Sequence, residues 1–117
     1  MDNFDSHFRD LFDNSSDFIY FLSIQGDIEL VNPAWLTTLG YKLNEVVGQS
    51  IYRFIHPDYV AAYRSNRTDV IKNNKIKDVE VAFLSRENKA IIGDGQVGCS
   101  YRNGVPIYTR CVFRNIT

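Results

Sequence analysis

The dipeptide Asn32-Pro33, inside the stretch GDIELVNPAWLTTLGY (residues 26–41), restricts the fold more than any other feature of the chain. A β-like run over residues 28–31 ends directly at this dipeptide. Asparagine is a preferred N-cap residue, because its side chain accepts a hydrogen bond from an otherwise unpaired N–H group of the first helical turn. Proline suits the first helical position, where its missing N–H costs nothing and its φ is already helical. We therefore predict a strand that turns at once into a helix over 33–39, ended by Gly40.

The rest of the chain divides into a further strand before this corner and three strands after the helices. The run FIYFLSI over residues 18–24 is aromatic and β-branched, and Gln25-Gly26 forms a turn between it and the next strand. Near the C-terminus, Asn103-Gly104 is the strongest hairpin signal in the chain. The three later strands are predicted over residues 79–84, 90–101 and 107–114.

Helical patterns fill the segment between the two groups of strands. Short helical pieces are predicted over 43–47 and 50–55, and His56-Pro57-Asp58 opens a longer helix over 57–71. One face of that helix carries Tyr59, Tyr63, Asn66 and Val70. Two groups of strands around a helical segment favour an α+β fold, an antiparallel sheet with the helices gathered on one face.

The N-terminal segment 1–16 is predicted to be a short amphipathic helix that precedes the domain of residues 17–117. Its apolar side chains, Phe4, Phe8, Leu11 and Phe12, recur at helical spacing. We expect this stripe to be incompletely covered by the domain itself. Pairing with a second copy of the chain, to form a homodimer, is therefore expected.

Composition excludes several classes of protein. A chain of 117 residues with 44% hydrophobic residues is expected to form one globular domain. Its net charge of −1 gives no electrostatic reason to bind nucleic acid or an anionic membrane. No apolar stretch approaches the roughly 20 residues that span a bilayer, and the acidic N-terminus is unlike a secretory signal. A cytoplasmic location is expected, in which Cys99 and Cys111 remain reduced thiols.

Short motifs spread over nearly the whole chain resemble those of the PAS family of sensor domains. They are Leu11-Phe12 with Asp17, Gly26, Asn32-x-Ala34, Gly40-Tyr41, Glu45-x-x-Gly48, His56-Pro57-Asp58 and the ending Arg114-Asn115-Ile116-Thr117. Each motif is weak alone, but their order and spacing together are specific. The resemblance implies a five-stranded antiparallel sheet that curls around a cavity roofed by the helices.

The same resemblance implies where a small-molecule ligand would sit, with Trp35 pointing into the cavity. The ligand-cavity candidates are Tyr20, Leu22, Val31, Trp35, Leu39, Phe54, Tyr63, Val81, Phe83, Gly93, Gly95 and Phe113. The alternative is that these residues are simply the core of a small domain, since aromatic residues at such spacings more often form a core than a binding site. Tyr63 and Arg67 could contact an anionic ligand at the mouth of the cavity. A solvated helix face is the plainer expectation for Arg67.

Cofactors and catalytic sites are not predicted. The stretch Gly48–Phe54 lacks the cysteine of flavin photoreceptors, and Phe113 stands where flavin-binding relatives carry glutamine, so flavin is not expected. His56 suits a helix cap better than a haem ligand, and no metal-ligand spacing occurs. Residues 93–98 match GxGxxG, but a strand and a hairpin follow instead of a helix, so these glycines indicate a bulge or a close approach of backbones. No catalytic triad or Walker loop can be assembled.

These observations predict a non-enzymatic sensory module that binds a small molecule and passes the signal to an output domain beyond Thr117. The resemblance implies a parent protein such as a histidine kinase or a cyclic-nucleotide-turnover enzyme. The alternative is an interaction module with a filled core that binds no ligand and only dimerises.

Overall fold

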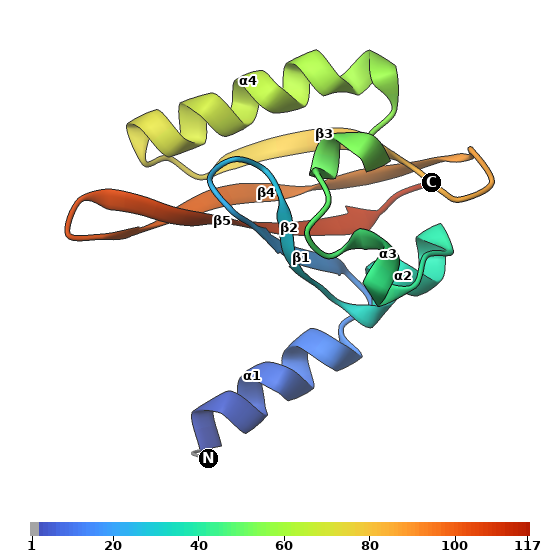
Figure 1. Ribbon diagram of the computed structural model, residues 1–117, viewed down its shortest axis with the longest axis horizontal. Coiled ribbons are helices and arrows are strands. Elements are labelled where there is room, and N and C mark those ends of the chain that lie inside the picture. The colour runs from blue at the N-terminus through green and yellow to red at the C-terminus, as the bar shows by residue number, and fades with distance from the viewer. Residues whose placement is uncertain (1–2) are drawn as a thin grey trace.

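The computed structural model describes residues 3–117, with side chains from Asp5 onward (Figure 1). In chain order, its elements are α1 (Asn3–Asn14), β1 (Phe18–Leu22), β2 (Ile28–Val31), α2 (Pro33–Leu39), α3 (Leu43–Val46), the 3-10 helix η1 (Ile51–Phe54), α4 (Pro57–Asn73), β3 (Lys77–Leu84), β4 (Ala90–Arg102) and β5 (Val105–Asn115). The order is the predicted one, and the predicted α+β architecture is confirmed.

The corner between β2 and α2 forms as the sequence predicts. Asn32 is extended, with φ −88° and ψ 165°, and its side-chain oxygen accepts the Trp35 N–H group at 3.3 Å. Pro33 occupies the first helical turn, and Gly40 ends the helix in the left-handed conformation, with φ 84°. Glycine tolerates that conformation without steric cost. The Asn32 N–H group donates to the Ile19 carbonyl at 3.0 Å, which fastens the corner to β1.

The five strands form one antiparallel sheet in the order β2-β1-β5-β4-β3. The first hairpin and the last hairpin therefore meet where β1 pairs with β5, and Phe18 lies opposite Phe113. Asn103 and Gly104 turn the last hairpin with positive φ values of 52° and 78°, as the Asn-Gly signal predicts. Segments far apart in the sequence thus line the centre of the sheet.

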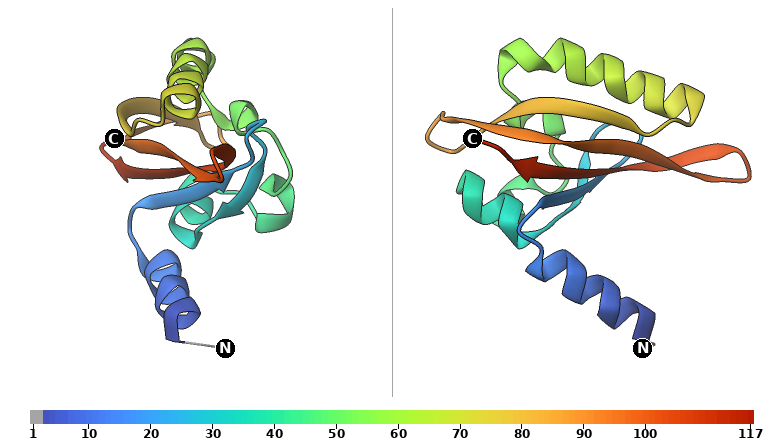
Figure 2. Two further views of the ribbon diagram at one scale, coloured as in Figure 1. Left: turned by 90° about the vertical axis from the view of Figure 1, so that its left-hand side faces the viewer. Right: turned by 180° about the vertical axis from the view of Figure 1, so that it is seen from behind.

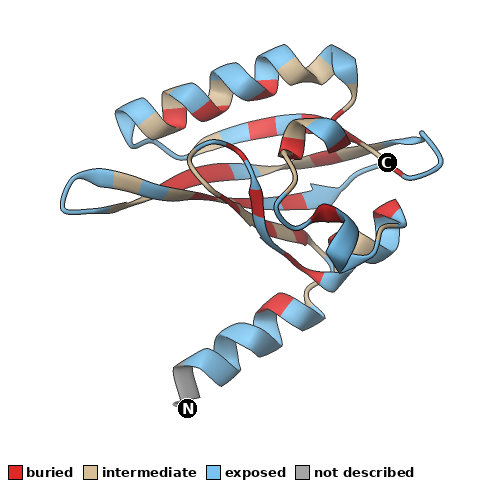
Figure 3. Cartoon of the chain, in the orientation of Figure 1, coloured by how far each residue is buried: buried red, intermediate tan, exposed pale blue. Residues whose placement is uncertain are grey.

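Helices cover both faces of the sheet unequally (Figure 2). We call the face that carries α2, α3, η1 and α4 the inner face, and the face beside α1 the outer face. Phe18, Tyr20 and Leu22 of β1 point inward and are buried, whereas the Phe21 ring points outward and lies 6.2 Å from the Phe12 ring of α1. Most buried residues lie between the sheet and the inner-face helices, and α1 is mostly exposed (Figure 3).

The ends of several elements differ from the prediction. The first strand ends at Leu22 and not at residue 24, because the turn to β2 begins at Ser23, whose carbonyl accepts the Gly26 N–H group at 2.9 Å. Arg67 also donates to the carbonyls of Ser23 and Ile24 in this turn. The last strand begins two residues earlier than predicted, at Val105. The His56 N-cap of α4 is confirmed, since its Nδ1 accepts the Asp58 N–H group at 3.1 Å.

Candidate functional site

The fold brings most of the ligand-cavity candidates together beneath the inner-face helices. Gly93 is buried, as are ten candidates with larger side chains, each at most 6% exposed: Tyr20, Leu22, Val31, Trp35, Leu39, Phe54, Tyr63, Val81, Phe83 and Phe113. These ten come from strands β1, β2, β3 and β5 and from α2, η1 and α4. The period-2 pattern of the strands and the helical spacing of Trp35 and Leu39 are what place them on the inner face.

The buried aromatic side chains pack ring against ring, and we call Phe18, Tyr20, Trp35, Phe54, Tyr63, Phe83 and Phe113 the aromatic interior. Phe83 is its centre, with ring centroids of Phe113, Phe18, Tyr20 and Trp35 at 5.7, 5.8, 6.0 and 6.2 Å. Three of these contacts are edge-to-face within 7° of perpendicular, which is a favoured geometry for aromatic pairs. Each of the rings around Phe83 is therefore in contact with the face or the edge of a neighbouring ring.

The two glycines proposed to line a cavity have different surroundings. A Cβ atom on Gly93 would lie 3.2 Å from both the Phe113 Cβ and the Phe83 Cε2, so the missing side chain leaves space that these rings use. A Cβ atom on Gly95 would lie 1.9 Å from the Val112 carbonyl oxygen. Gly95 is therefore required by the close approach of β4 to β5, as the strand-glycine interpretation predicts.

A buried polar chain crosses the aromatic interior. The hydroxyl groups of Tyr20 and Tyr63 share a hydrogen bond of 2.7 Å, and the Tyr63 hydroxyl lies 3.5 Å from the Cys111 sulfur. Burial raises the pKa of both phenols well above the ordinary 10.0, and it raises the pKa of the Cys111 thiol to about 11. All three groups are therefore uncharged at neutral pH. Cys99 and Cys111 both have free thiols and form no disulfide.

Arg67 is buried, which contradicts the expectation of a solvated helix face. Only 5% of it is exposed, because it follows Tyr63 by four residues and precedes Val70 by three on the buried face of α4. Its Nη1 donates to the Tyr52 hydroxyl at 3.1 Å, and its Nη2 donates to the Ser23 carbonyl at 3.1 Å. The helical period alone would have placed it on this face, but its charge argued for solvent.

Two buried side-chain nitrogens among the described residues have no hydrogen-bond partner. They are Nε1 of Trp35 and Nε of Arg67. A buried donor without a partner costs free energy, roughly 1–3 kcal/mol. Such groups are uncommon in folded proteins, and each marks a place where an acceptor could bind.

Asn32 connects four segments through its buried side chain. The Oδ1 atom accepts from Ile19 N at 3.1 Å and from Trp35 N at 3.3 Å. The Nδ2 atom donates to the Asp17 carbonyl at 2.9 Å and to the Phe12 carbonyl at 3.2 Å. The sequence predicted the cap of α2. It did not predict that the same side chain would fasten the end of α1 and the start of β1.

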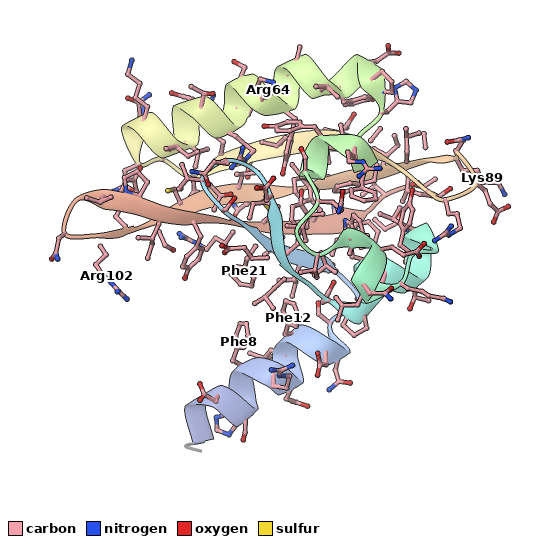
Figure 4. All side chains as sticks on the ribbon, in the orientation of Figure 1. Phe8, Phe12, Phe21, Arg64, Lys89 and Arg102 are labelled. Carbon is pink, nitrogen blue, oxygen red and sulfur yellow. The ribbon has the colours of Figure 1, made fainter. Side chains whose placement is uncertain are left out.

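The predicted signal helix, α1, lies against the outer face through aromatic contacts (Figure 4). The Phe12 ring stacks on the Phe8 ring at 5.5 Å and is buried, while Phe8 is 41% exposed and Leu11 71% exposed. The Phe4 side chain lies outside the described residues. The domain thus covers one end of the stripe and leaves Leu11 in solvent.

Other sites considered from the sequence find little support in the geometry. Nowhere in residues 5–117 do three His, Cys, Asp or Glu side chains gather in a way that could hold a metal ion. Phe113, at the position that carries glutamine in flavin-binding relatives, is packed among rings. No helix in the described part of the chain is long and apolar enough to cross a membrane.

Comparison with known proteins gives consistent results. The chain matches the family model described as PAS, or PAS fold, over residues 6–116. No curated protein matches it. A PAS domain from Colwellia psychrerythraea is 20% identical and superimposes with a TM-score of 0.89, covering 99% of this chain and 98% of that one. The PAS domain of an HTR-like protein from Haloarcula marismortui is 23% identical, with a TM-score of 0.81 and coverages of 97% and 93%.

A third similar structure contains a ligand. It is the PAS domain of the RpfR quorum-sensing receptor from Cronobacter turicensis in complex with BDSF, 24% identical, with a TM-score of 0.75. The match covers 89% of this chain and 97% of that one. At these identities, the three structures support the fold of this chain and not its ligand.

Proposed function

This chain belongs to the PAS family, and from that premise we propose that it is a sensory and interaction module of a larger cytoplasmic signalling protein. In this proposal the module itself catalyses no reaction, pairs with a second copy, and controls an output domain that follows Thr117. A histidine kinase or a cyclic-nucleotide-turnover enzyme is the parent protein we favour. Nucleic acid and membrane are not among its proposed partners, since the net charge is only −1.

The observation that carries this proposal is the apolar surface shared by α1 and the outer face. Leu11 is 71% exposed, Leu30 48%, Val112 42% and Phe8 41%. Phe8 and Leu30, with Phe21, also line a shallow hollow of about 460 Å³ beside α1. A contiguous patch of large apolar side chains favours association. We propose a second copy as the occupant, because α1 presents the same stripe on each copy, as a two-fold interface requires.

Signal transfer in this proposal is a shift between two packings of α1 against the domain. Support comes from the Asn32 side chain, which joins the last turn of α1 at the Phe12 carbonyl to the start of α2 at Trp35. A change in the aromatic interior that moves α2 would therefore act on α1 through two hydrogen bonds. The pairing of β1 with β5 gives a second connection, toward the C-terminus.

The experiment that tests the interaction role is sedimentation of the wild-type chain, Leu11→Glu and the control Ser6→Glu. Ser6 is exposed on α1 and lies away from the stripe. We expect a wild-type dimer whose dissociation constant rises about tenfold or more in Leu11→Glu, because a carboxylate would be buried in an apolar contact. Ser6→Glu adds the same charge and should leave the dimer intact. A wild-type chain that stays monomeric at all concentrations would refute the proposal.

A second candidate function, sensing a small molecule in the interior, is favoured by the unpaired buried Nε1 of Trp35. An acceptor atom of a ligand could satisfy this N–H group. Solved PAS structures with bound molecules, such as the RpfR domain with BDSF and the Drosophila Cycle PAS-B domain with ethylene glycol, support the idea. Haem and flavin are not part of it, since the histidines and Phe113 are unsuited to hold them. Mass spectrometry of the purified chain under native conditions tests whether a molecule co-purifies.

A further inference from the structure

Arg67 is a buried cation that hydrogen-bonds only neutral groups. Beyond Tyr52 and Ser23, its Nη2 lies 3.3 Å from the Ile24 carbonyl and 3.5 Å from the Thr109 hydroxyl. All four acceptors are uncharged oxygen atoms. The side chain is 95% buried, with an exposed fraction of 5%. An arginine side chain carries one positive charge and offers only hydrogen-bond donors.

The positive charge of Arg67 has no counter-charge among the described residues. The ion pairs found within 4 Å join His56 to Asp58, Lys77 to Asp69, Arg86 to Glu45 and Arg114 to Asp94. None of them includes Arg67. Buried arginine side chains in folded proteins are almost always paired with an anion, because the charge loses its hydration on burial. The part of the chain that the structure describes therefore supplies no anionic partner for this cation.

The position of Arg67 leaves one edge of the guanidinium group unused. The Nη atoms hold the β1–β2 turn and η1, and Gly26 allows the close fit, since a Cβ atom there would lie 3.1 Å from Nη1. The Nε–H group is buried and has no partner. It is a charged donor, and hydrogen bonds from charged donors to anions are about twice as strong as those between neutral groups.

We infer that a ligand would reach the Nε–H group of Arg67 from solvent beside Tyr52. The Tyr52 side chain is only half-buried, and Arg64, which is exposed on α4, covers its ring with the guanidinium carbon 4.1 Å from the ring centroid. For a ligand to enter here, Tyr52 would have to give up its hydrogen bond with Nη1 of Arg67. Tyr63 precedes Arg67 by one helical turn on the buried face of α4, and it belongs to the aromatic interior.

We propose that Arg67 is the anchor of a binding site for a small monocarboxylate, whose carboxylate accepts the Nε–H hydrogen bond and neutralises the guanidinium charge. One carboxylate carries one negative charge and balances one guanidinium group. A phosphate group, with a charge of about −1.5 to −2, would leave an excess of negative charge beside the uncharged phenols. The rings of Tyr52 and Tyr63, which pack 5.9 Å apart beside the guanidinium group, offer apolar surface for a short alkyl chain attached to the carboxylate. This inference rests on the ligand-sensing candidate above and gives it a ligand class.

The test is a titration of the wild-type chain with sodium acetate and sodium butyrate, with sodium chloride at equal ionic strength as reference. The Arg67 Nε–H resonance is followed by NMR and the melting temperature by thermal denaturation. We expect a saturable shift of the Nε–H resonance and a saturable rise in melting temperature with the carboxylates and not with chloride, and a stronger effect with butyrate. Inorganic phosphate should bind more weakly than either.

Two variants complete the test. Arg67→Gln should weaken carboxylate binding about tenfold or more, because a charged hydrogen bond is lost. Arg102→Gln removes the same charge at the exposed tip of the last hairpin, far from Arg67, and should bind as the wild type does. A wild-type spectrum in which the Nε–H resonance does not shift would overturn the proposal, even if Arg67→Gln fails to fold. Equal loss in both variants would also overturn it, since a general charge effect would then explain the binding. Dimerisation through α1 can be present in either case, so the two proposals fail separately.

Discussion

Replacing Asn32 with alanine is expected to destabilise the chain more than the loss of an ordinary helix cap. The substitution removes hydrogen bonds to four buried or partly buried backbone groups, at Phe12, Asp17, Ile19 and Trp35. A cap alone contributes about 1 kcal/mol. At a net value of about 1 kcal/mol for each hydrogen bond, the total is about 4 kcal/mol, reduced where the released groups reach water. A loss of about 2–4 kcal/mol is therefore expected, a large part of the stability of a domain of this size.

Asn32→Ser separates the two roles of this side chain. Serine is also a good N-cap and can still accept from Trp35, but it is too short to reach the carbonyls of Phe12 and Asp17. We expect Asn32→Ser to be about 1 kcal/mol more stable than Asn32→Ala and still well below wild type. Urea unfolding followed by the fluorescence of the single tryptophan gives the free energies. Hydrogen exchange at residues 12–19 should accelerate in both variants.

The result that would refute this reasoning is specific. If Asn32→Ala lowers the free energy of unfolding by about 1 kcal/mol or less, the bonds to α1 and β1 contribute nothing beyond the cap. If Asn32→Ser unfolds as the wild type does, the same conclusion follows. In either case the proposed connection between α1 and the interior loses its support.

Three further predictions concern the interior and the sheet. Trp35→Ala should cost about 3–5 kcal/mol in urea unfolding if Trp35 is a core residue; a folded variant with weaker ligand binding would support sensing instead. Because the Cys111 pKa rises from 9.0 to about 11 on folding, the uncharged thiol contributes stability below pH 9 that is lost as the pH rises to 11, roughly 3 kcal/mol in all. Melting temperatures across this range should therefore fall less in Cys111→Ala, and an identical fall would contradict the burial effect. Gly95→Ala should be far more destabilising in thermal denaturation than Gly104→Ala, because its Cβ would lie 1.9 Å from the Val112 oxygen whereas nothing lies within 4 Å at Gly104; equal effects would exclude the clash.

Those parts of the fold that local chemistry determines were predictable from the sequence. The Asn32 cap, Gly40 and the Asn103-Gly104 turn each require a particular backbone conformation, so they fixed where a helix or a hairpin lies. The alternation along β1 and β3 placed the right side chains on the inner face. Element ends were less predictable. The strand ends at Leu22 because the turn to β2 begins at Ser23, and Arg67, 44 residues further along the sequence, donates to the carbonyls of that turn.

The sequence indicated which residues form the candidate site, but it did not indicate how their side chains pack. The PAS resemblance indicated that Tyr20, Trp35, Phe83 and Phe113 face the interior, but whether their rings pack together or line a space depends on rotamers and on strand register. Register also decides that the missing Cβ of Gly93 faces Phe83 and Phe113. Such contacts join residues from different strands, and no local pattern encodes them. The burial of Arg67 was not predicted, because a charged side chain was expected in solvent although its helical position indicates the buried face.

Strand β1 connects the two proposals, because side chains from the helical layer hold it at both ends. At its start, Asn32 binds Ile19 and joins it to α1 and α2. Just beyond its end, Arg67 binds Ser23 and joins it to α4. The strand between them carries Tyr20, whose hydroxyl bonds to Tyr63 of α4. A paired strand is stiff along its length, so an anion that repositions Arg67 would act on β1 directly, and the effect would reach α1 through Asn32. This arrangement gives a physical reason why occupancy near α4 could change the packing of a helix on the opposite face of the sheet.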